Sequence, residues 1–249
     1  MKAVSIASGS KGNAYLVGNG EETVLIDRGV PYKALAGDEF SAVLITHSHT
    51  DHVSGLKTLL RHRDIPVYAN LMTAESIAEQ ERIDDSVFVC FENGQCFDLG
   101  GLSVHPFSVP HDTADSVGYL ISSGGVNYFH GTDIGSPLDS VGMMLAEADI
   151  ATLESNHDPV LLRTSGRPPC LIQRIAGPRG HLSNDDACSL VRRFASPHLR
   201  YLSLAHLSRD CNAPHIAEGA MRATLHEMGR DDVLLQVLAQ DCIGKVCEI

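Results

Sequence analysis

Short apolar segments separated by polar turns fill the first half of the chain, and this pattern predicts strands. Residues 3–8, 13–18 and 22–27 are rich in Val, Ile, Leu and Tyr, and glycine-rich turns join them. The first turn, residues 8–13, resembles a phosphate-binding loop, but such a loop leads into a helix, whereas residues 14–17 are typical of a strand. We therefore predict a tight hairpin turn, and a second role near a substrate stays open.

Helical spacing of apolar residues first appears just after residue 52, at Val53, Leu56, Leu59 and Leu60. Another helix is predicted from Ser183, a good N-cap, because Asp186 three residues later completes a capping box. A third is predicted over residues 213–228, with Asn212 as its N-cap. The remaining expected elements are helices near residues 71–80 and 137–146, and strands at 42–45, 66–69, 87–90, 96–98, 102–107, 117–123, 126–130, 149–153, 201–205 and 233–239.

The order of these elements predicts an α/β protein. Strands dominate the first half of the sequence, strands and helices alternate in the second, and there is no low-complexity segment or linker. Helices on the outer faces of two packed sheets would bury the apolar side of every element. The 249 residues are enough for a sizeable core, so we predict one compact domain over residues 1–249.

Composition narrows the class of protein. No apolar run approaches the roughly 18–20 residues of a membrane span, and the N-terminus is too polar for a signal peptide. We therefore expect a cytoplasmic protein that does not bind membranes. The seven cysteines are scattered without a CxxC pair, which favours reduced thiols that serve as small packing residues and not as metal ligands. The net charge of -12 argues against a broad nucleic-acid-binding surface, although not against a local basic patch.

Four side chains that can bind metal follow the apolar run at residues 42–45; they are His47, His49, Asp51 and His52. The run predicts a short buried strand, so this HxHxDH cluster lies on the loop at its end. Packing gives no reason for three imidazoles and a carboxylate there, whereas zinc, iron and manganese take both as ligands. Residues two apart can point the same way, so the first two histidines can share one ion while the other two residues face a second. The alternative is a solvated histidine-rich loop.

Three later ligand-type residues repeat this arrangement, each shortly after a predicted strand. His111 follows residues 102–107, Asp133 follows 126–130, and His206 follows 201–205. Loops at strand ends often carry functional residues, because the sheet positions them rigidly. Each residue could be structural on its own, but together with HxHxDH they favour a metal centre.

The order of these motifs resembles the metallo-β-lactamase superfamily along the whole chain. The resemblance implies an αββα sandwich with a site for two divalent metal ions at the edges of its sheets. One ion would be held by His47, His49 and His111, the other by Asp51, His52 and His206, and both by one carboxylate oxygen of Asp133. Two such ions lower the pKa of a shared water, which serves as the nucleophile. Zinc or manganese is expected, and iron also suits these ligands.

Motifs in the second half narrow the resemblance. Residues 154–158 read ESNHD, 180–184 read GHLSN, 204–208 read LAHLS, and 8–13 read SGSKGN. The series is similar to tRNase Z-type phosphodiesterases and closer to the YycJ/WalJ-like branch. Membership of that branch implies a metal-dependent nuclease of the 5′-to-3′ DNA exonuclease kind, acting on nucleic acid or another phosphodiester.

The resemblance also implies catalytic roles. His181 would stabilise the phosphorane oxygens and protonate the leaving group, and Glu154 would orient His181 and keep it protonated. Asp51 is counted as catalytic as well as a ligand. Leu153 stands where the HEAT motif of tRNase Z has its histidine, which weakens the transfer of tRNase Z details. The alternative for His181 is a structural histidine beside a helix.

Charge reverses locally between residues 159 and 184, where there is no acid and there are four arginines: Arg163, Arg167, Arg174 and Arg179. We predict an anion-binding rim beside the metals, in which Arg174, Arg179, Ser183 and Asn184 face phosphates. The alternative is that these arginines are scattered over solvated faces. We further predict that two histidines, His157 and His130, support the metal ligands from behind, with a purely structural role as the alternative.

Other functions stay open at this point. A thioester or lactam hydrolase shares the fold, but GHLSN and the arginines favour a phosphodiester. A small or cyclic phosphodiester is a further alternative to DNA. The complete ligand set argues against a non-catalytic metal-binding protein. Because the chain lacks a long insertion, pre-tRNA processing is not expected.

Overall fold

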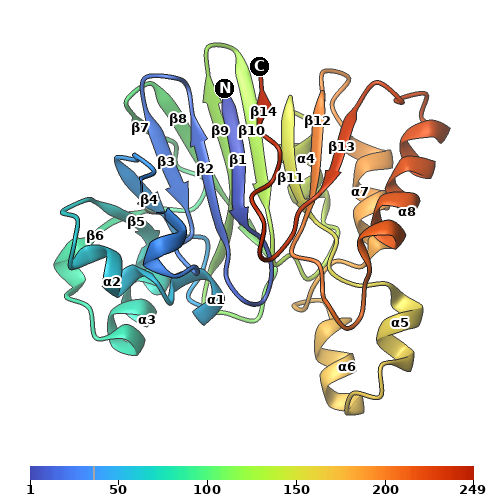
Figure 1. The fold of residues 1–249 in the computed structure, drawn as a ribbon, viewed down its shortest axis with the longest axis horizontal. Helices are drawn as coiled ribbons and strands as arrows, with labels where there is room; N and C mark the ends of the chain where they lie inside the picture. Colours follow the sequence, from blue (N-terminus) through green and yellow to red (C-terminus); the bar gives the residue numbers. More distant parts are fainter. Residues whose placement is uncertain (36) are drawn as a thin grey trace.

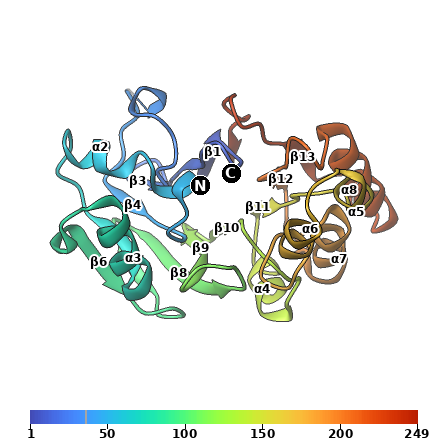
Figure 2. The ribbon, with the colours of Figure 1, turned by 90° about the horizontal axis from the view of Figure 1, so that it is seen from below.

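Two sheets pack face to face and carry helices on both outer faces, as Figure 1 and Figure 2 show for the computed structural model, which describes residues 1–35 and 37–249. Each sheet has seven strands. This arrangement confirms the predicted αββα sandwich, and it leaves the strand ends of both sheets side by side at the lower edge of Figure 1.

The first sheet comes from the N-terminal part of the chain and its last strand. Its strands are β1 (Lys2–Ala7), β2 (Ala14–Gly18), β3 (Thr23–Ile26), β4 (Ala42–Leu44), β5 (Val67–Asn70), β6 (Phe88–Phe91) and β14 (Cys247–Glu248). They lie in the order β14-β1-β2-β3-β4-β5-β6, antiparallel from β14 to β3 and parallel from β3 to β6. Residues 8–13 join two antiparallel strands, which confirms the hairpin turn.

The second sheet is also mixed. Its strands are β7 (Phe97–Leu99), β8 (Leu102–Val109), β9 (Ser116–Ser123), β10 (Val126–Gly131), β11 (Ile150–Glu154), β12 (Tyr201–Ala205) and β13 (Leu234–Val237). They lie in the order β13-β12-β11-β10-β9-β8-β7, antiparallel from β7 to β10 and parallel from β10 to β13. In the parallel part all strands end at one edge, which brings their following loops together.

Helices cover the outer face of each sheet. They are α1 (Thr50–Val53), α2 (Leu56–Leu60), α3 (Leu71–Glu81), α4 (Asp139–Leu145), α5 (Pro159–Thr164), α6 (Pro169–Ile175), α7 (Asn184–Phe194) and α8 (Pro214–Glu227), with short 3-10 turns at Tyr32–Leu35 and Asp85–Val87. The apolar residues form one cluster between the sheets and one beneath the helices of each outer face. No helix in the described ranges is long and apolar enough to cross a membrane.

Local sequence signals fail in three places. The helix predicted from Val53 is two short helices, because the carbonyl of Val30 and the side chain of Arg28 lie against Gly55 between them. The N-cap of α8 is Ala213, since the Asn212 side chain is buried and donates to backbone carbonyls near the end of β11. The short helices α5 and α6 were not expected from the sequence. The capping box at the start of α7 is confirmed.

Candidate metal centre

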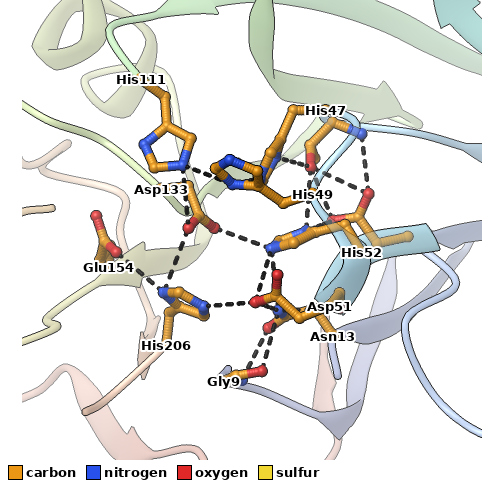
Figure 3. A network of polar contacts seen from close by, with 12 residues as sticks. Gly9, Asn13, His47, His49, Asp51, His52, His111, Asp133, Glu154 and His206 are labelled. Carbon is orange, nitrogen blue, oxygen red and sulfur yellow. Dashed lines mark hydrogen bonds and ion pairs between the residues drawn. The ribbon is translucent and has the colours of Figure 1, made fainter. Parts of the chain in front are cut away.

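Loops after strands of both sheets bring the candidate ligands together (Figure 3). His47 and His49 lie on the loop after β4, but Asp51 and His52 lie in the short helix α1, so only half of the HxHxDH cluster is on the predicted loop. His111 follows β8, Asp133 follows β10 and His206 follows β12. Asp133 and His206 have positive φ angles of 56° and 55°. A non-glycine residue in this conformation costs roughly 1–3 kcal/mol. The surrounding structure therefore holds two of these side chains in place against backbone strain.

Three imidazoles form the first group, His47, His49 and His111. Nδ1 of His49 lies 3.2 Å from Nε2 of His47 and 3.2 Å from Nε2 of His111. Burial lowers the pKa of each histidine, so all three favour the neutral form. Neutral imidazole is the form that binds metal. The three nitrogens can thus share a single cation without first losing a proton.

The second group consists of Asp51, His52 and His206. Oδ2 of Asp51 lies 3.4 Å from Nε2 of His206 and 3.6 Å from Nε2 of His52. Asp133 lies between the two groups: its Oδ1 is 3.7 Å from Nε2 of His111 and 3.5 Å from Nδ1 of His206. The geometry brings together all seven side chains that the sequence proposed as ligands.

The chemistry of these donors fits bound divalent ions. Asp27, Asp133 and Glu154 are buried carboxylates in one small region, and buried negative charge needs a positive partner. Oδ2 of Asp133 has no partner in hydrogen-bond geometry among the described residues, although Nε2 of His52 is 3.2 Å away. Burial would lower the pKa of His206, but the carboxylates around it, Asp133 first, raise it to about 10. The region therefore attracts positive charge, which divalent cations would supply.

Asp27 contacts the candidate ligand His52 from behind, whereas Asn13 lies at the nitrogen of the same ring that faces Asp51 and Asp133, and sequence reasoning assigned neither a role. Oδ2 of the buried Asp27 lies 2.7 Å from Nδ1 of His52, and Oδ1 accepts a hydrogen bond from the Thr46 backbone N–H at 2.9 Å. Nδ2 of Asn13 lies 3.0 Å from Nε2 of His52. A partner on the ring nitrogen that does not face the metal, as Asp27 is for His52, fixes the tautomer and orientation of a histidine ligand. The strand was predicted over residues 22–27, whereas β3 ends at Ile26, so Asp27 follows the strand as the candidate ligands do.

Glu154, at the end of β11, is fully buried and all of its contacts lie in the centre. Its Oε1 is 2.8 Å from Nδ1 of His181 and 3.2 Å from Nδ1 of His206. Its Oε2 accepts from the backbone N–H groups of Ile134 and Leu182 at 2.7 and 3.1 Å. Burial alone would raise the pKa of Glu154, but His181 and these contacts lower it to about 2, so the group stays ionised.

His181 is held in the opposite protonation state. Burial would lower its pKa, but the charge of Glu154 and the hydrogen bond to it raise the pKa above its ordinary value. Because Nδ1 faces Glu154, Nε2 is directed away from that carboxylate. Gly180 allows the tight turn just before His181, since a Cβ at position 180 would lie 2.1 Å from the carbonyl oxygen of Ile175. The imidazole thus has the orientation and charge of a proton donor.

A cavity of about 320 Å³ opens at three of the candidate ligands, Asp51, Asp133 and His206. It is lined by Ser10, Asp51, Asp112, Asp133, Asn156, Arg167, Leu171, Arg174, Ile175, Gly180, His181, His206 and Ser208. Two of the four arginines of the predicted rim, Arg167 and Arg174, are therefore at the cavity. Arg174 pairs with Asp112 at 2.5 Å, and Arg167 pairs with Asp210 at 2.7 Å.

The other predicted rim residues lie elsewhere. Arg179 donates to the backbone carbonyls of His111 and Thr113 at 2.8 and 3.0 Å, which fixes the loop that carries a candidate ligand. Ser183 caps α7, and Asn184 is buried with its side chain bonded to Ser155 and Asn212. The cavity lining includes none of these three residues. Their polar groups are occupied within the protein, by the local capping box for Ser183 and by long-range contacts for Arg179 and Asn184.

The two histidines predicted to support the ligands are buried away from the cavity. Nδ1 of His130 lies 3.1 Å from the hydroxyl of Tyr128, and its ring packs edge-on against Tyr15. Burial lowers the pKa of His130 to about 3, so it is neutral. The backbone carbonyl of His157 accepts from the N–H of Asn184 at 2.9 Å. Through this bond His157 positions the start of α7 beside the GHLSN turn.

The combination of an αββα sandwich with histidine and aspartate groups at its strand ends defines a metallo-β-lactamase-fold hydrolase. Residues 26–202 match the family described as the Beta-lactamase superfamily domain. The chain therefore belongs to the β-lactamase superfamily. The expected resemblance to the YycJ/WalJ branch is also confirmed by the relatives below.

Two curated relatives cover most of this chain. Exodeoxyribonuclease YycJ of Bacillus anthracis is 32% identical over 235 residues, 90% of this chain and 89% of the relative. Exodeoxyribonuclease WalJ of Streptococcus pneumoniae serotype 2 (strain D39) is 29% identical over 228 residues, 87% of this chain and 85% of the relative. The zinc-bound crystal structure of PqqB from Methylobacterium extorquens has a TM-score of 0.75 at 17% identity, with 100% of both chains covered. This last similarity shows a shared fold.

Proposed function

We propose that this protein is a dinuclear metal-dependent phosphodiesterase that removes nucleotides from DNA in the 5′-to-3′ direction. The observation that carries the proposal is the His181–Glu154 pair, 2.8 Å apart, in which His181 lines the same cavity as Asp51, Asp133 and His206. A proton donor beside a metal centre suits a reaction with a poor leaving group, such as the sugar oxygen of DNA. The names of YycJ and WalJ as exodeoxyribonucleases support a DNA substrate.

Two ions are proposed, each with three protein ligands of its own and a share of Asp133. His47, His49 and His111 would hold the first, and Asp51, His52 and His206 would hold the second. When bound, the ions would supply a water of lowered pKa as nucleophile and neutralise charge on the phosphate. Imidazole and carboxylate ligands suit zinc or manganese, and also iron.

Side chains of the protein are proposed to supply the proton that the leaving oxygen needs. As the water oxygen forms its bond to phosphorus, the bond from phosphorus to the sugar 3′ oxygen breaks. His181 gives its proton to that oxygen, and Glu154 orients the imidazole and stabilises its charged form. Asp51, which faces the cavity beside His206, is proposed to orient the attacking water in addition to binding metal.

Positive charge on the cavity wall is proposed to bind the substrate phosphates. Arg174 is 63% exposed and lies beside the centre, so its free N–H groups can reach an anion. Arg167 is the second candidate, although Asp210 holds one of its nitrogens. We infer that Arg179, Ser183 and Asn184 act indirectly, by fixing the His111 loop and the start of α7.

We also infer that residues 1–249 work as one domain in the cytoplasm. Ligands from both sheets build the same centre, which supports a single domain. All seven cysteines lie in the described residues and are free thiols, which suits a reducing compartment.

Digestion of end-labelled DNA tests the proposal. Metal-loaded protein should release labelled mononucleotide from a 5′-labelled duplex at the earliest times, and should shorten a 3′-labelled strand progressively. Parallel assays with RNA and with chromogenic phosphodiester, thioester and lactam substrates define the bond class. Preference for a thioester or lactam would contradict the proposal, and immediate loss of a 3′ label would contradict the direction. Metal analysis of the same preparation should give two equivalents.

A further inference from the structure

Helices α5 and α6 form a hairpin that adds little to the apolar core. We call residues 158–180 the α5–α6 hairpin; Figure 1 shows it beyond the ends of the strands, below α7 and α8. In α5 only Leu162 is buried, and in α6, all of whose residues the structure describes, none is. Burial in the core therefore does not explain the apolar residues that α6 carries.

One face of α6 forms a wall of the cavity. Leu171, Arg174 and Ile175 have the spacing i, i+3 and i+4, which places them on the same side of the helix. All three line the cavity that also contains Asp133 and His206. Leu171 and Ile175 are half-buried. They thus give an apolar surface to a cavity whose floor is made of charged groups.

Contacts at both sides hold this wall in place. Arg174 pairs with Asp112 on the loop after β8, and Arg167 pairs with Asp210 on the loop after β12. The backbone carbonyl of Ile175 accepts the N–H of His181 at 2.9 Å. The position of the apolar wall is therefore fixed relative to the candidate proton donor.

The size and chemistry of the cavity select its occupant. Its volume of about 320 Å³ is near the lower end of the range for small-ligand sites, roughly 300–1,000 Å³, which suits one nucleotide. The charged floor and Arg174 would be sufficient to bind a phosphate without any apolar wall. Two aliphatic side chains beside it gain nothing from a bare anion, but they can pack on a sugar and a base.

The position of His181 indicates on which side of the cavity the leaving nucleotide lies. A proton donor lies beside the oxygen that leaves, so the nucleotide attached to that oxygen lies on the side of His181. His181 and Ile175 share a backbone hydrogen bond, so this is also the side of the hairpin. In a 5′-to-3′ exonuclease it is the terminal nucleotide, which is released.

We propose that Leu171 and Ile175 form the apolar wall of a subsite for the terminal nucleotide that leaves, an inference that rests on the proposed phosphodiesterase function. The wall contacts the sugar and base of that nucleotide while its phosphate faces Arg174. The wall contributes to the affinity for a terminal nucleotide, but not to the affinity for inorganic phosphate.

Calorimetric titration of the metal-loaded full chain with deoxyadenosine 5′-monophosphate, and separately with inorganic phosphate, tests this subsite. The double variant Leu171→Ala/Ile175→Ala should bind the nucleotide about tenfold more weakly, the effect of removing aliphatic contacts from a pocket. Its affinity for inorganic phosphate should stay within about twofold of wild type. The conservative variant Leu171→Met/Ile175→Val should retain nucleotide affinity. Ile172→Ala is the matched control, because Ile172 lies on the same helix outside the cavity lining.

The outcomes separate this inference from the proposed function. Equal nucleotide affinity in wild type and the double variant, or an equal loss for inorganic phosphate, would overturn the subsite even if the protein degrades DNA. A selective loss of nucleotide affinity would support the subsite. If that loss occurs in a protein that degrades no DNA, the subsite stands and the exonuclease proposal fails. A thermal melt of each variant verifies that it is folded.

Discussion

Oε1 of Glu154 lies 2.8 Å from Nδ1 of His181 and 3.2 Å from Nδ1 of His206. One buried carboxylate oxygen therefore orients both the candidate proton donor and a candidate metal ligand. Because Oε2 accepts two backbone N–H groups, the carboxylate itself has little freedom to move. The end of β11 thus couples proton transfer to metal binding, and substitutions there can separate the two.

Replacement of His181 by alanine should slow hydrolysis in a way that depends on the leaving group. We expect kcat on DNA to fall by roughly 10²–10⁴-fold, the usual contribution of general acid catalysis. A p-nitrophenyl phosphodiester should lose much less, because p-nitrophenolate departs without a proton. Glu154→Gln should likewise lower kcat on DNA more than kcat on the p-nitrophenyl phosphodiester, but both losses should be smaller. Equal losses on both substrates would contradict the role of His181 as proton donor.

Asp27 should control metal affinity without touching the metal. Asp27→Ala removes the carboxylate 2.7 Å from Nδ1 of His52, which frees the ring to rotate. Loss of such a partner weakens metal binding by roughly 10- to 100-fold. Competition with a chromogenic chelator measures this change directly. The surface variant Asp139→Ala, which loses only an exposed pair with Arg193, should bind metal like wild type.

The two arginines predicted together as substrate ligands should behave differently. Arg174→Ala should raise KM for oligonucleotides about tenfold, the value of a charged hydrogen bond, with little change on a minimal phosphodiester. Arg179→Ala should instead lower kcat on both substrates, since Arg179 fixes the backbone of His111. Steady-state kinetics on both substrates measures the difference. Identical profiles for the two variants would contradict the separate roles.

The capping box of α7 should contribute measurably to stability. Ser183→Ala removes the Oγ that accepts the Asp186 backbone N–H at 3.1 Å. We expect the free energy of unfolding to fall by about 1 kcal/mol, which urea denaturation of the metal-loaded protein measures. Ser103→Ala on the exposed side of β8 is the control and should change little. A loss no larger than that of the control would refute the contribution of the cap.

The sequence alone predicted an α/β protein and most strands, because short apolar runs and their periodicity are local properties, and its motifs carried the resemblance that implied the αββα sandwich. It also determined which residues could bind metal, since each lies at the end of a strand whose position the pattern predicts. The box formed by Ser183 and Asp186 was equally readable, because both partners lie within one helical turn. Those features depend on neighbours along the chain.

Tertiary structure decided which of the charged groups meet. Arg174 and Asp112 are 62 residues apart and pair at the cavity, whereas Arg179 bonds to the loop of His111. The α5–α6 hairpin gave little signal, because its helices are short and bury almost nothing in the core. Asp27 was equally hidden, since only the packing of β3 beside β4 brings it to His52. Spacing fixes the candidate ligands, while long-range packing selects their partners and the wall that faces a substrate.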